Sequence, residues 1–235
     1  MSATLGDLEE PPDDDAWALS GPELVCRAAV RTLGMSGAGI SVMTPAGHRG
    51  TVCASDQVAS QVEELQFTLG EGPCIDAFNS GGPVLISDLA RSSENASRWP
   101  VFSRAAVVAG VRALFAFPIQ IGAIRIGALD LYRVEPTALT PAQLSAALKL
   151  SDVVAVSLLD LRSGNTTARG DGGPVGASYR LEVHQATGMV MAQLGVGIDE
   201  AFVRLRGYAF ARDISVADLA RDIVAGMIQF HLEDG

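Results

Sequence analysis

Three helical patterns follow one another in the C-terminal part of the chain, and this feature constrains the fold more than any other. Apolar residues recur at intervals of three and four through 179–194, which predicts a helix that ends before Gly195. A second pattern of this kind covers 199–211. The third begins at Ser215, which together with Asp218 has the form of an N-terminal capping box. Short helices with such signals between them predict a three-helix bundle.

The same region carries a more specific signal in its residue types. The segments are HQATGMVMAQ at 184–193, EAFVRLR at 200–206 and VADLARDIV at 216–224. They resemble the three signature helices of the ANTAR family, and the resemblance extends over 179–230. Members of that family are RNA-binding antitermination modules of bacterial regulators. The resemblance therefore implies that the C-terminal bundle binds RNA hairpins in nascent transcripts.

The resemblance places the RNA contacts on the first two helices of the bundle. Arginine side chains there can reach phosphates or a base edge, and a tyrosine ring offers a stacking plane. Leu205 and Tyr208 are equally compatible with the bundle core, and Ala201 with close packing between helices. The candidate RNA-binding residues are Gln185, Ala186, Thr187, Gly188, Met191, Gln193, Arg204, Arg206, Tyr208 and Arg212.

Charge restricts the way in which this bundle can bind RNA. The net charge of the chain is −10, and residues 179–235 contain eight acidic residues against five arginines. Members of the family often have a lysine where Thr187 stands and an arginine where Gln193 stands. Binding through many phosphates requires a basic surface. We therefore expect weaker binding, or binding that depends on dimerisation, through specific contacts to the splayed bases of hairpin loops.

The region 20–162 alternates between strand and helix patterns. Antiparallel strands with helices before, between and after them predict the α+β class, with one sheet flanked by helices on both sides. The strand patterns lie at 38–43, 51–55, 83–87, 113–119 and 125–132, and the helix patterns at 20–34, 57–69, 102–109 and 140–161.

Two motifs in this region resemble the GAF domain family. They are LGEGPC at 69–74 and the strand pair FPIQI and IGALDLY within 117–132. GAF domains before ANTAR domains are a familiar order in actinobacterial regulators, so the two resemblances support each other. The resemblance implies a sensor domain that can enclose a small ligand, and a filled core without a ligand is the alternative. The expected pocket residues are Phe67, Leu69, Glu71, Cys74, Phe78 and Phe115.

The helix predicted at 140–161 is apolar on nearly all sides. A single sheet can cover only one stripe of such a helix. We expect a parallel homodimer that packs along this helix. The alternative places the helix between the sheet and the first N-terminal helix.

The composition of two segments separates the domains. Residues 1–19 contain a run of acidic residues with no apolar pattern, which predicts a disordered acidic tail. Residues 163–178 are rich in glycine and small residues, which predicts a flexible linker. The expected domains are thus a sensor and dimerisation domain at 20–162 and an RNA-binding domain at 179–235.

Several classes of chemistry find no support in the sequence. No phosphate-binding loop or dinucleotide motif is present, and the three histidines have no metal-like spacing. Cys26, Cys53 and Cys74 form no paired motif, and we expect them to be reduced and structural. No apolar run has the length of a membrane span, and the first residues do not resemble a signal peptide. The expectation is a cytoplasmic protein that is not an enzyme and needs no cofactor or metal.

These observations predict a regulator of transcription antitermination in which a GAF sensor domain controls an ANTAR domain that binds tandem RNA hairpins. A protein-interaction regulator, or a small-molecule sensor with weak or no RNA binding, is the alternative.

Overall fold

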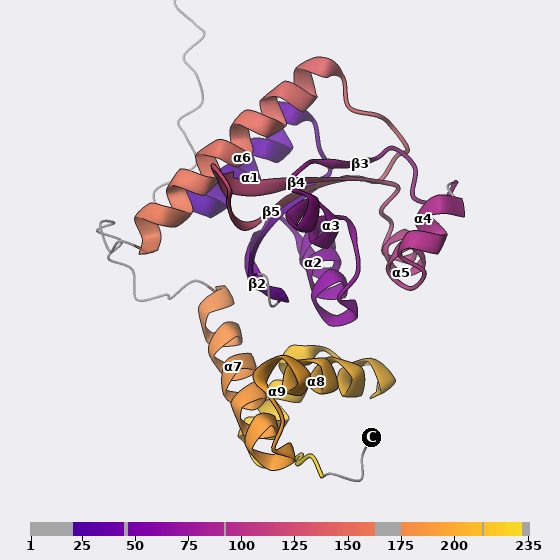
Figure 1. The fold of residues 1–235 in the computed structure, drawn as a ribbon. Helices are drawn as coiled ribbons and strands as arrows, with labels where there is room; N and C mark the ends of the chain where they lie inside the picture. The colour runs from indigo at the N-terminus through magenta and orange to yellow at the C-terminus, as the bar shows by residue number, and fades with distance from the viewer. Residues whose placement is uncertain (1–20, 45–46, 92, 163–174, 213, 232–235) are drawn as a thin grey trace, which may run out of the picture.

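The computed structural model describes residues 21–44, 47–91, 93–162, 175–212 and 214–231 (Figure 1). Its N-terminal domain is built on a five-stranded antiparallel sheet in the order β2-β1-β5-β4-β3. The predicted α+β class and its antiparallel sheet are confirmed. The strands are β1 (Gly37–Thr44), β2 (Gly47–Ala54), β3 (Val84–Ile86), β4 (Ala113–Ile121) and β5 (Ile124–Arg133).

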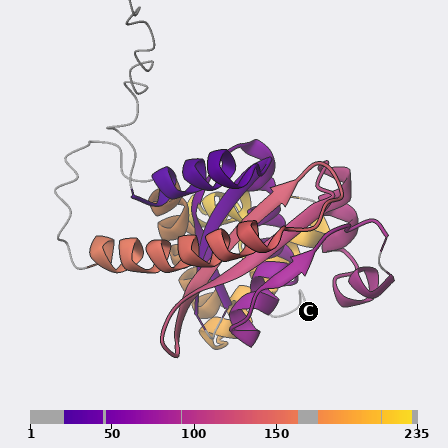
Figure 2. The same cartoon turned by 90° about the horizontal axis from the view of Figure 1, so that it is seen from above.

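Helices cover both faces of this sheet. α1 and α6 lie side by side on one face, as the view from above shows (Figure 2), whereas α2 and α3 cover the other. The helices of this domain are α1 (Gly21–Leu33), α2 (Gln57–Leu69), α3 (Pro73–Ser80), α4 (Ser93–Arg98), α5 (Phe102–Val108) and α6 (Pro141–Arg162).

The alternation of side chains along the strands divides the core into two layers. On β4, Phe115 and Phe117 face α1 and α6, whereas Leu114 and Ala116 face the side of α2. All four side chains are at most 1% exposed. Because successive residues of a strand point to opposite faces, one apolar strand supplies both layers.

α2 is fixed at both ends by local signals. The Asp56 side chain accepts a hydrogen bond from the backbone N–H of Ala59 at 2.9 Å, which caps the N-terminus. Gly70 ends the helix in the left-handed region, with φ of +66°. The helix is thereby held across the sheet, with one side toward β1 and the other toward the C-terminal helices.

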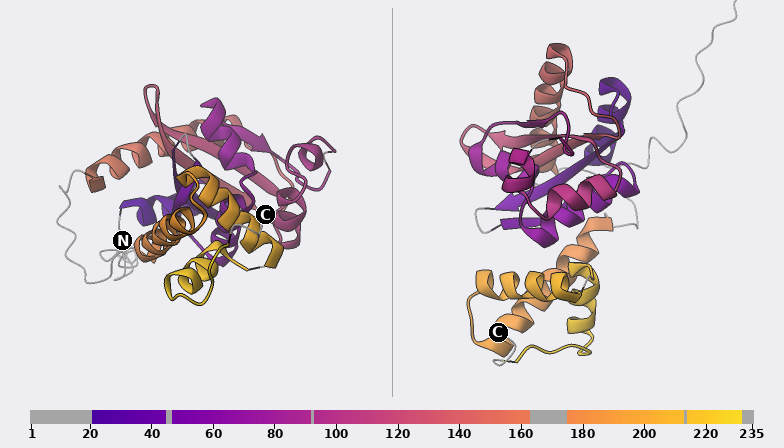
Figure 3. Two further views of the ribbon diagram at one scale, coloured as in Figure 1. Left: turned by 60° about the horizontal axis from the view of Figure 1, so that its bottom comes forward. Right: turned by 90° about the vertical axis from the view of Figure 1, so that its right-hand side faces the viewer.

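The C-terminal domain is the predicted bundle of three helices, α7 (Val175–Leu194), α8 (Ile198–Arg212) and α9 (Val216–Val224). Ser215 caps α9 by accepting a hydrogen bond from the backbone N–H of Asp218 at 3.0 Å, and its hydroxyl donates to the Asp218 carboxylate. Ser215 is therefore the predicted cap. The bundle lies beneath α2 of the first domain (Figure 3).

The structure differs from the predicted elements at a few places. α3 begins within the Gly-Pro motif, since Pro73 occupies the first turn of a helix where its missing N–H does no harm. α4 has no counterpart among the predicted helices, and α7 begins at Val175, inside the predicted linker. The predicted tail and most of the predicted linker lie outside the described residues.

The expectation for the cysteines is wrong for two of them. Cys26 of α1 and Cys53 of β2 form a disulfide, although they are 27 residues apart in sequence. Only Cys74 is a free thiol among the described cysteines, and it is buried. The pairing arises from the packing of α1 against β2, which no spacing rule for short motifs encodes.

Among the described residues, nothing covers one face of α6. Val154 and Leu158 are buried toward the sheet, whereas Val153 and Val156 are 52% and 57% exposed. Residues 141–159 are apolar enough, by length and composition, to cross a membrane, and 28% of that window is buried. Val154 and Leu158 pack against the sheet, and insertion of α6 into a membrane would break these contacts. The packing is therefore evidence against a membrane span.

Candidate nucleic-acid interface

The interface between the two domains is formed by β2 and α2 on one side and by α7, α8 and α9 on the other. The ring of Phe67 on α2 packs against the ring of Phe202 on α8, with their centroids 5.4 Å apart. Phe67 is 2% exposed and belongs to the apolar cluster of the C-terminal bundle. The backbone N–H of Val216 on α9 donates a hydrogen bond to the Glu64 carboxylate at 3.3 Å. The N-terminal domain thus supplies both an aromatic and a polar contact to the bundle.

Arg206, a predicted RNA contact, lies within this interface. Its guanidinium stacks over Phe202 at 5.2 Å from the ring centroid and touches Gly70 so closely that a Cβ there would clash. Burial lowers the pKa of Arg206 below its ordinary value, but arginine remains charged at neutral pH. The Nε atom of Arg206 has no hydrogen-bond partner among the described residues. No carboxylate among the described residues contributes to this shift, so the docked position buries the cation without a compensating negative charge from that part of the chain.

The other two arginines of α8 contact residues of the same helix. Arg204 donates from Nε and Nη2 to the Glu200 carboxylate, at 3.2 and 2.9 Å. Arg212 lies over the ring of Tyr208, 4.8 Å from its centroid. Exposed ion pairs of this kind contribute little stability. Arg204 can consequently exchange Glu200 for a phosphate at small cost.

Tyr208 is not open for base stacking in this arrangement. Its ring packs against Phe230 with centroids 5.0 Å apart, and Arg212 covers it as well. Among the residues whose exposure is described, Phe210 is the one exposed aromatic side chain, at 55%. Sequence reasoning missed Phe210. Its helical spacing of four residues from Arg206 and eight from Phe202 is the signal that identifies it.

The predicted residues of α7 divide between surface and core. Gln185 and Met191 are exposed and Gly188 is half-buried, whereas Ala186 and Thr187 are buried. The Thr187 hydroxyl donates to the carbonyl oxygen of residue 183 at 2.7 Å. Direct contact of Ala186 or Thr187 with RNA is excluded while the bundle stays closed, because both side chains lie inside it.

Gln193 also has a structural contact. Its side-chain oxygen accepts a hydrogen bond from the backbone N–H of Phe230 at 3.0 Å, which fastens the segment after α9 to α7. Leu205 and Ala201 are fully buried, so both residues belong to the core of the bundle, which was the alternative to an RNA contact. At the two positions where the family resemblance suggests a cation, Thr187 is buried in the bundle and Gln193 holds the segment after α9.

The six residues expected to line a ligand pocket do not surround one cavity. Phe115 lies on the face of α1 and α6, whereas Cys74 and Phe78 lie on the opposite face. Phe67 contacts α8, and the Glu71 carboxylate accepts hydrogen bonds from the N–H groups of residues 101 and 102 at the start of α5. Leu69 packs with the cluster around Trp99. The prediction that these residues line a ligand pocket stays a prediction.

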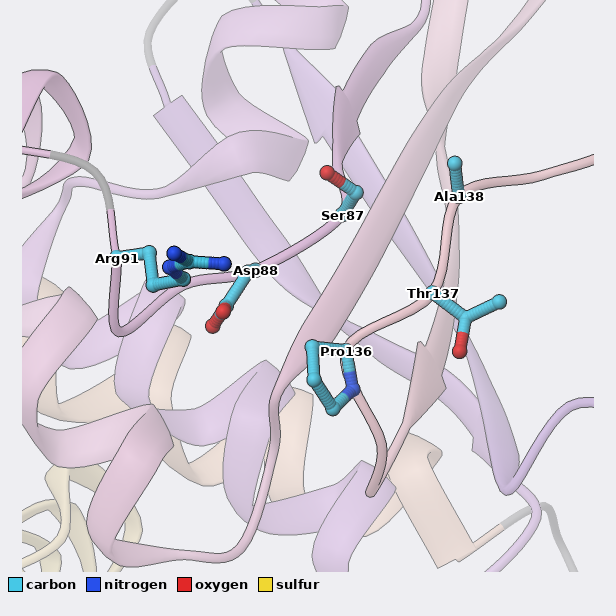
Figure 4. A pocket seen from close by; sticks show the side chains of 6 residues that line it. All are labelled: Ser87, Asp88, Arg91, Pro136, Thr137 and Ala138. Carbon is cyan, nitrogen blue, oxygen red and sulfur yellow. The ribbon is translucent and has the colours of Figure 1, made fainter.

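An open pocket of about 620 Å³ lies elsewhere, between the segment after β3 and the segment after β5 (Figure 4). Asp88 at its edge forms an ion pair with Arg112 at 3.1 Å. None of the six expected residues is among those that line it. The lining residues are Ser87, Asp88, Arg91, Pro136, Thr137 and Ala138.

Comparison with known families assigns both domains. The family model of the GAF domain matches residues 23–158, which is more than half of the chain. The chain belongs to the GAF domain family. The ANTAR domain model matches residues 178–224, which include most of α7 and all of α8 and α9. Both predicted resemblances are thereby confirmed, with the GAF domain first and the ANTAR domain after it.

Solved structures resemble the GAF domain at low identity. A GAF domain/HD domain protein from Geobacter sulfurreducens is 11% identical, with 61% of this chain and 92% of that chain covered and a TM-score of 0.49. The GAF domain of a phosphoenolpyruvate-protein phosphotransferase from Coxiella burnetii is 12% identical, with coverage of 61% and 83% and a TM-score of 0.47. A type II free methionine-R-sulfoxide reductase from Thermoplasma acidophilum is 15% identical, with coverage of 59% and 89% and a TM-score of 0.45. No curated protein matches the chain.

Proposed function

We propose that this protein is a cytoplasmic, non-enzymatic antitermination regulator whose ANTAR domain binds tandem RNA hairpins under the control of its GAF domain. One observation carries the proposal. Arg206, a position that the family resemblance assigns to RNA, is packed on Phe202 and against Gly70 of the GAF domain. The Arg206 side chain can therefore contact either RNA or the GAF domain, but not both at once. A sensor domain that changes this contact changes RNA binding.

The proposed RNA face consists of the accessible residues of α7 and α8. Phe202, Arg206 and Phe210 follow one another at intervals of four, so they form one stripe along α8. The GAF domain covers the first two, and Phe210 projects beyond the contact as an exposed ring. Aromatic and arginine side chains are suited to stacking on unpaired bases. The other proposed contacts are Gln185, Met191, Arg204 and Arg212.

Replacing Arg206 tests the proposal directly. In the Phe67→Ala background, which loosens the contact between the domains, we expect Arg206→Ala to weaken binding to a tandem-hairpin RNA about tenfold or more. The measurement is a fluorescence titration at fixed salt, with a scrambled-loop RNA beside it. Arg221→Ala is the matched control, because Arg221 is an exposed arginine on α9 that pairs with Asp218. Equal binding of native and scrambled RNA, or equal loss in both variants, would contradict the proposal.

A protein-interaction regulator is the second candidate function. It is favoured by the acidic balance of the ANTAR domain and by the engagement of Arg204 and Arg212 within the bundle. No binding of hairpin RNA at low salt, by native protein and by Phe67→Ala alike, would favour this candidate, because binding through phosphates strengthens as salt is lowered.

We further propose that two copies pair along α6. The exposed apolar residues of that helix lie on one face, away from the sheet, where a second copy can cover them across a twofold axis. A dimer presents two ANTAR domains, which suits a pair of hairpins. The exposed residues are Leu148, Val153, Val156 and Leu159.

Charged substitutions on α6 test this pairing. We expect native protein to have about twice the chain mass of 24.5 kDa in light scattering, and Val153→Asp with Val156→Asp to have that mass once. Val108→Asp is the control, because Val108 is 89% exposed on α5, away from this face. A monomeric native protein at tens of micromolar would exclude the dimer.

A further inference from the structure

A disulfide joins two layers of the GAF domain. Cys26 on α1 is bonded to Cys53 on β2, and the loop that the bond closes contains the rest of α1 and all of β1. β2 lies at the edge of the sheet, where it pairs with β1. The bond therefore ties an edge strand to the layer of helices that covers one face of the sheet.

The site of this bond accommodates a reduced pair as well. Buried apolar clusters fill both faces of the sheet, so a domain of this size does not need a disulfide for its stability. Cys26 and Cys53 belong to one of these clusters, and a reduced cysteine packs as a small apolar side chain. The Cys53 Sγ atom lies 3.2 Å from the carbonyl oxygen of Pro22, which can accept a hydrogen bond from the thiol after reduction.

The chemistry of the bond follows from its surroundings. A disulfide in a cytoplasmic protein is usually transient, because glutathione and thioredoxin keep thiols reduced there. This step rests on the proposed function, which places the protein in the cytoplasm. Cys74 is fully buried on the opposite face of the sheet and cannot attack the bond. Exchange therefore requires an external thiol, which reaches Cys53 first, since Cys53 is 7% exposed and Cys26 is 1% exposed.

The exchange takes place in two steps. An external thiolate attacks the Cys53 Sγ atom, the bond between the two cysteines breaks, and Cys26 leaves as a thiolate that takes up a proton. A second external thiolate attacks the external sulfur of the mixed disulfide and releases Cys53, which is protonated in turn. Two external thiols are thereby oxidised to one disulfide, and the cysteine pair gains two electrons and two protons. A small external disulfide reverses both steps.

β2 connects this bond to the ANTAR domain. α1 contacts β2, and α7 contacts the same strand. Figure 1 shows that the N-terminal half of α7 lies next to β2. The contacts of α8 and α9 lie on α2 and on Gly70, which carry neither cysteine of the pair. β2 also keeps its pairing with β1 and its packing on α2 after reduction, so opening the bond loosens β2 and the start of α7 while α8 stays docked.

We propose that Cys26 and Cys53 form a reversible thiol–disulfide site through which the GAF domain exchanges electrons with small thiols of the cytoplasm. The closed bond holds β2 firmly against α1 and thereby steadies α7, which packs on that strand. The open pair leaves β2 and the start of α7 more mobile. The redox state of the GAF domain thus reaches the first helix of the ANTAR domain.

A redox titration of the full-length protein tests the exchange. The protein is equilibrated from the oxidised and from the reduced side in mixtures of reduced and oxidised glutathione, and free thiols are then alkylated and identified by mass spectrometry. We expect the pair to pass from about 90% oxidised to about 10% oxidised over a change of about a hundredfold in the ratio of squared reduced to oxidised glutathione. A bond that stays closed at cytoplasmic ratios, or a pair that stays open in oxidised glutathione, would overturn the proposal.

Hydrogen exchange tests the effect on β2 and α7. Amide protection is compared between oxidised and reduced native protein at one pH. We expect protection to fall about tenfold in 47–54 and 175–184 on reduction, and less than about twofold in 198–212. Cys26→Ala cannot form the bond and is expected to show the low protection under both conditions. Cys74→Ala is the matched control and should respond as native protein does, because Cys74 is outside the pair.

Cys53→Ala provides a second route if Cys26→Ala folds poorly, and the reduced native protein needs no substitution. Equal protection of 47–54 and 175–184 in both redox states, or a response that persists in Cys26→Ala, would also overturn the proposal. RNA titration of the oxidised and reduced forms separates this proposal from the RNA function. A reversible bond with no binding of hairpin RNA in either form would keep the redox site and reject the RNA function.

Discussion

We expect Phe67→Ala to increase the affinity of the full-length protein for hairpin RNA about tenfold. The ring of Phe67 is 2% exposed and packs against Phe202, so its loss removes the main apolar contact between α2 and α8. Truncation of a buried phenylalanine costs about 3–5 kcal/mol, and part of that cost falls on docking. A larger fraction of molecules then presents Arg206 to RNA. The apparent dissociation constant falls in proportion to that fraction.

Two controls accompany this measurement. Phe117→Ala makes the same change in an equally buried residue on the face of α1 and α6, away from α8. It is expected to lower stability without changing RNA affinity. Circular dichroism then shows whether the ANTAR helices remain folded in Phe67→Ala. Unchanged RNA affinity with intact helices would mean that docking does not regulate binding.

We expect Glu63→Gln to stabilise the GAF domain by about 3 kcal/mol near pH 8 and to have little effect near pH 4. The folded-state pKa of Glu63 is about 7, against 4.5 for an unperturbed glutamate. Below pH 4.5 both states are protonated, and the burial of Glu63 carries no ionisation cost. As pH rises from 4.5 to about 7, the unfolded state loses its proton first, so the free energy of unfolding falls. Glutamine carries no charge in either state, and this loss disappears.

The measurement is urea unfolding of native protein and Glu63→Gln at several pH values. Tryptophan fluorescence reports on the GAF domain through Trp99, which is buried in that domain, and residues 163–235 contain no tryptophan. Asp130 remains in the variant, so a smaller decline with pH should persist. Glu200→Gln is the control, since an exposed carboxyl of α8 should change stability by less than about 0.5 kcal/mol. Parallel pH profiles of native protein and Glu63→Gln would contradict the burial of an ionisable Glu63.

Most elements of the fold could be predicted because their signals are local. The helix at 57–69 was predicted with the bounds of α2, and the strands of the GAF sheet follow from runs of apolar and β-branched residues. Ser215 was recognised as a cap because its partner lies three residues away. α3 was missed because its glycines and proline indicate a loop, although proline is well suited to a first helical turn.

The candidate site could be predicted only in part. The resemblance pointed to α8 and to Arg206, but residue type does not reveal which positions of a helix are covered by another domain. Thr187 is polar but lies inside the bundle, whereas Phe210 is apolar but is exposed on its surface. Polarity alone predicts the opposite for both residues. By residue type alone, Glu63 would be expected on the solvent-exposed side of its helix. Its burial depends on Gly39, which leaves space for its carboxylate on a strand far away in sequence.

The sequence by itself determined that a GAF domain precedes an ANTAR domain, because periodicity, helix caps and family motifs each depend on residues within one short segment. The tertiary structure alone decided which of those segments touch. Phe67 meets Phe202, Cys26 meets Cys53 and Glu63 faces Asp130, each pair from different elements. Such contacts depend on how helices of fixed length pack on a twisted sheet. Their energies come from burial at sites that no local pattern of residues specifies.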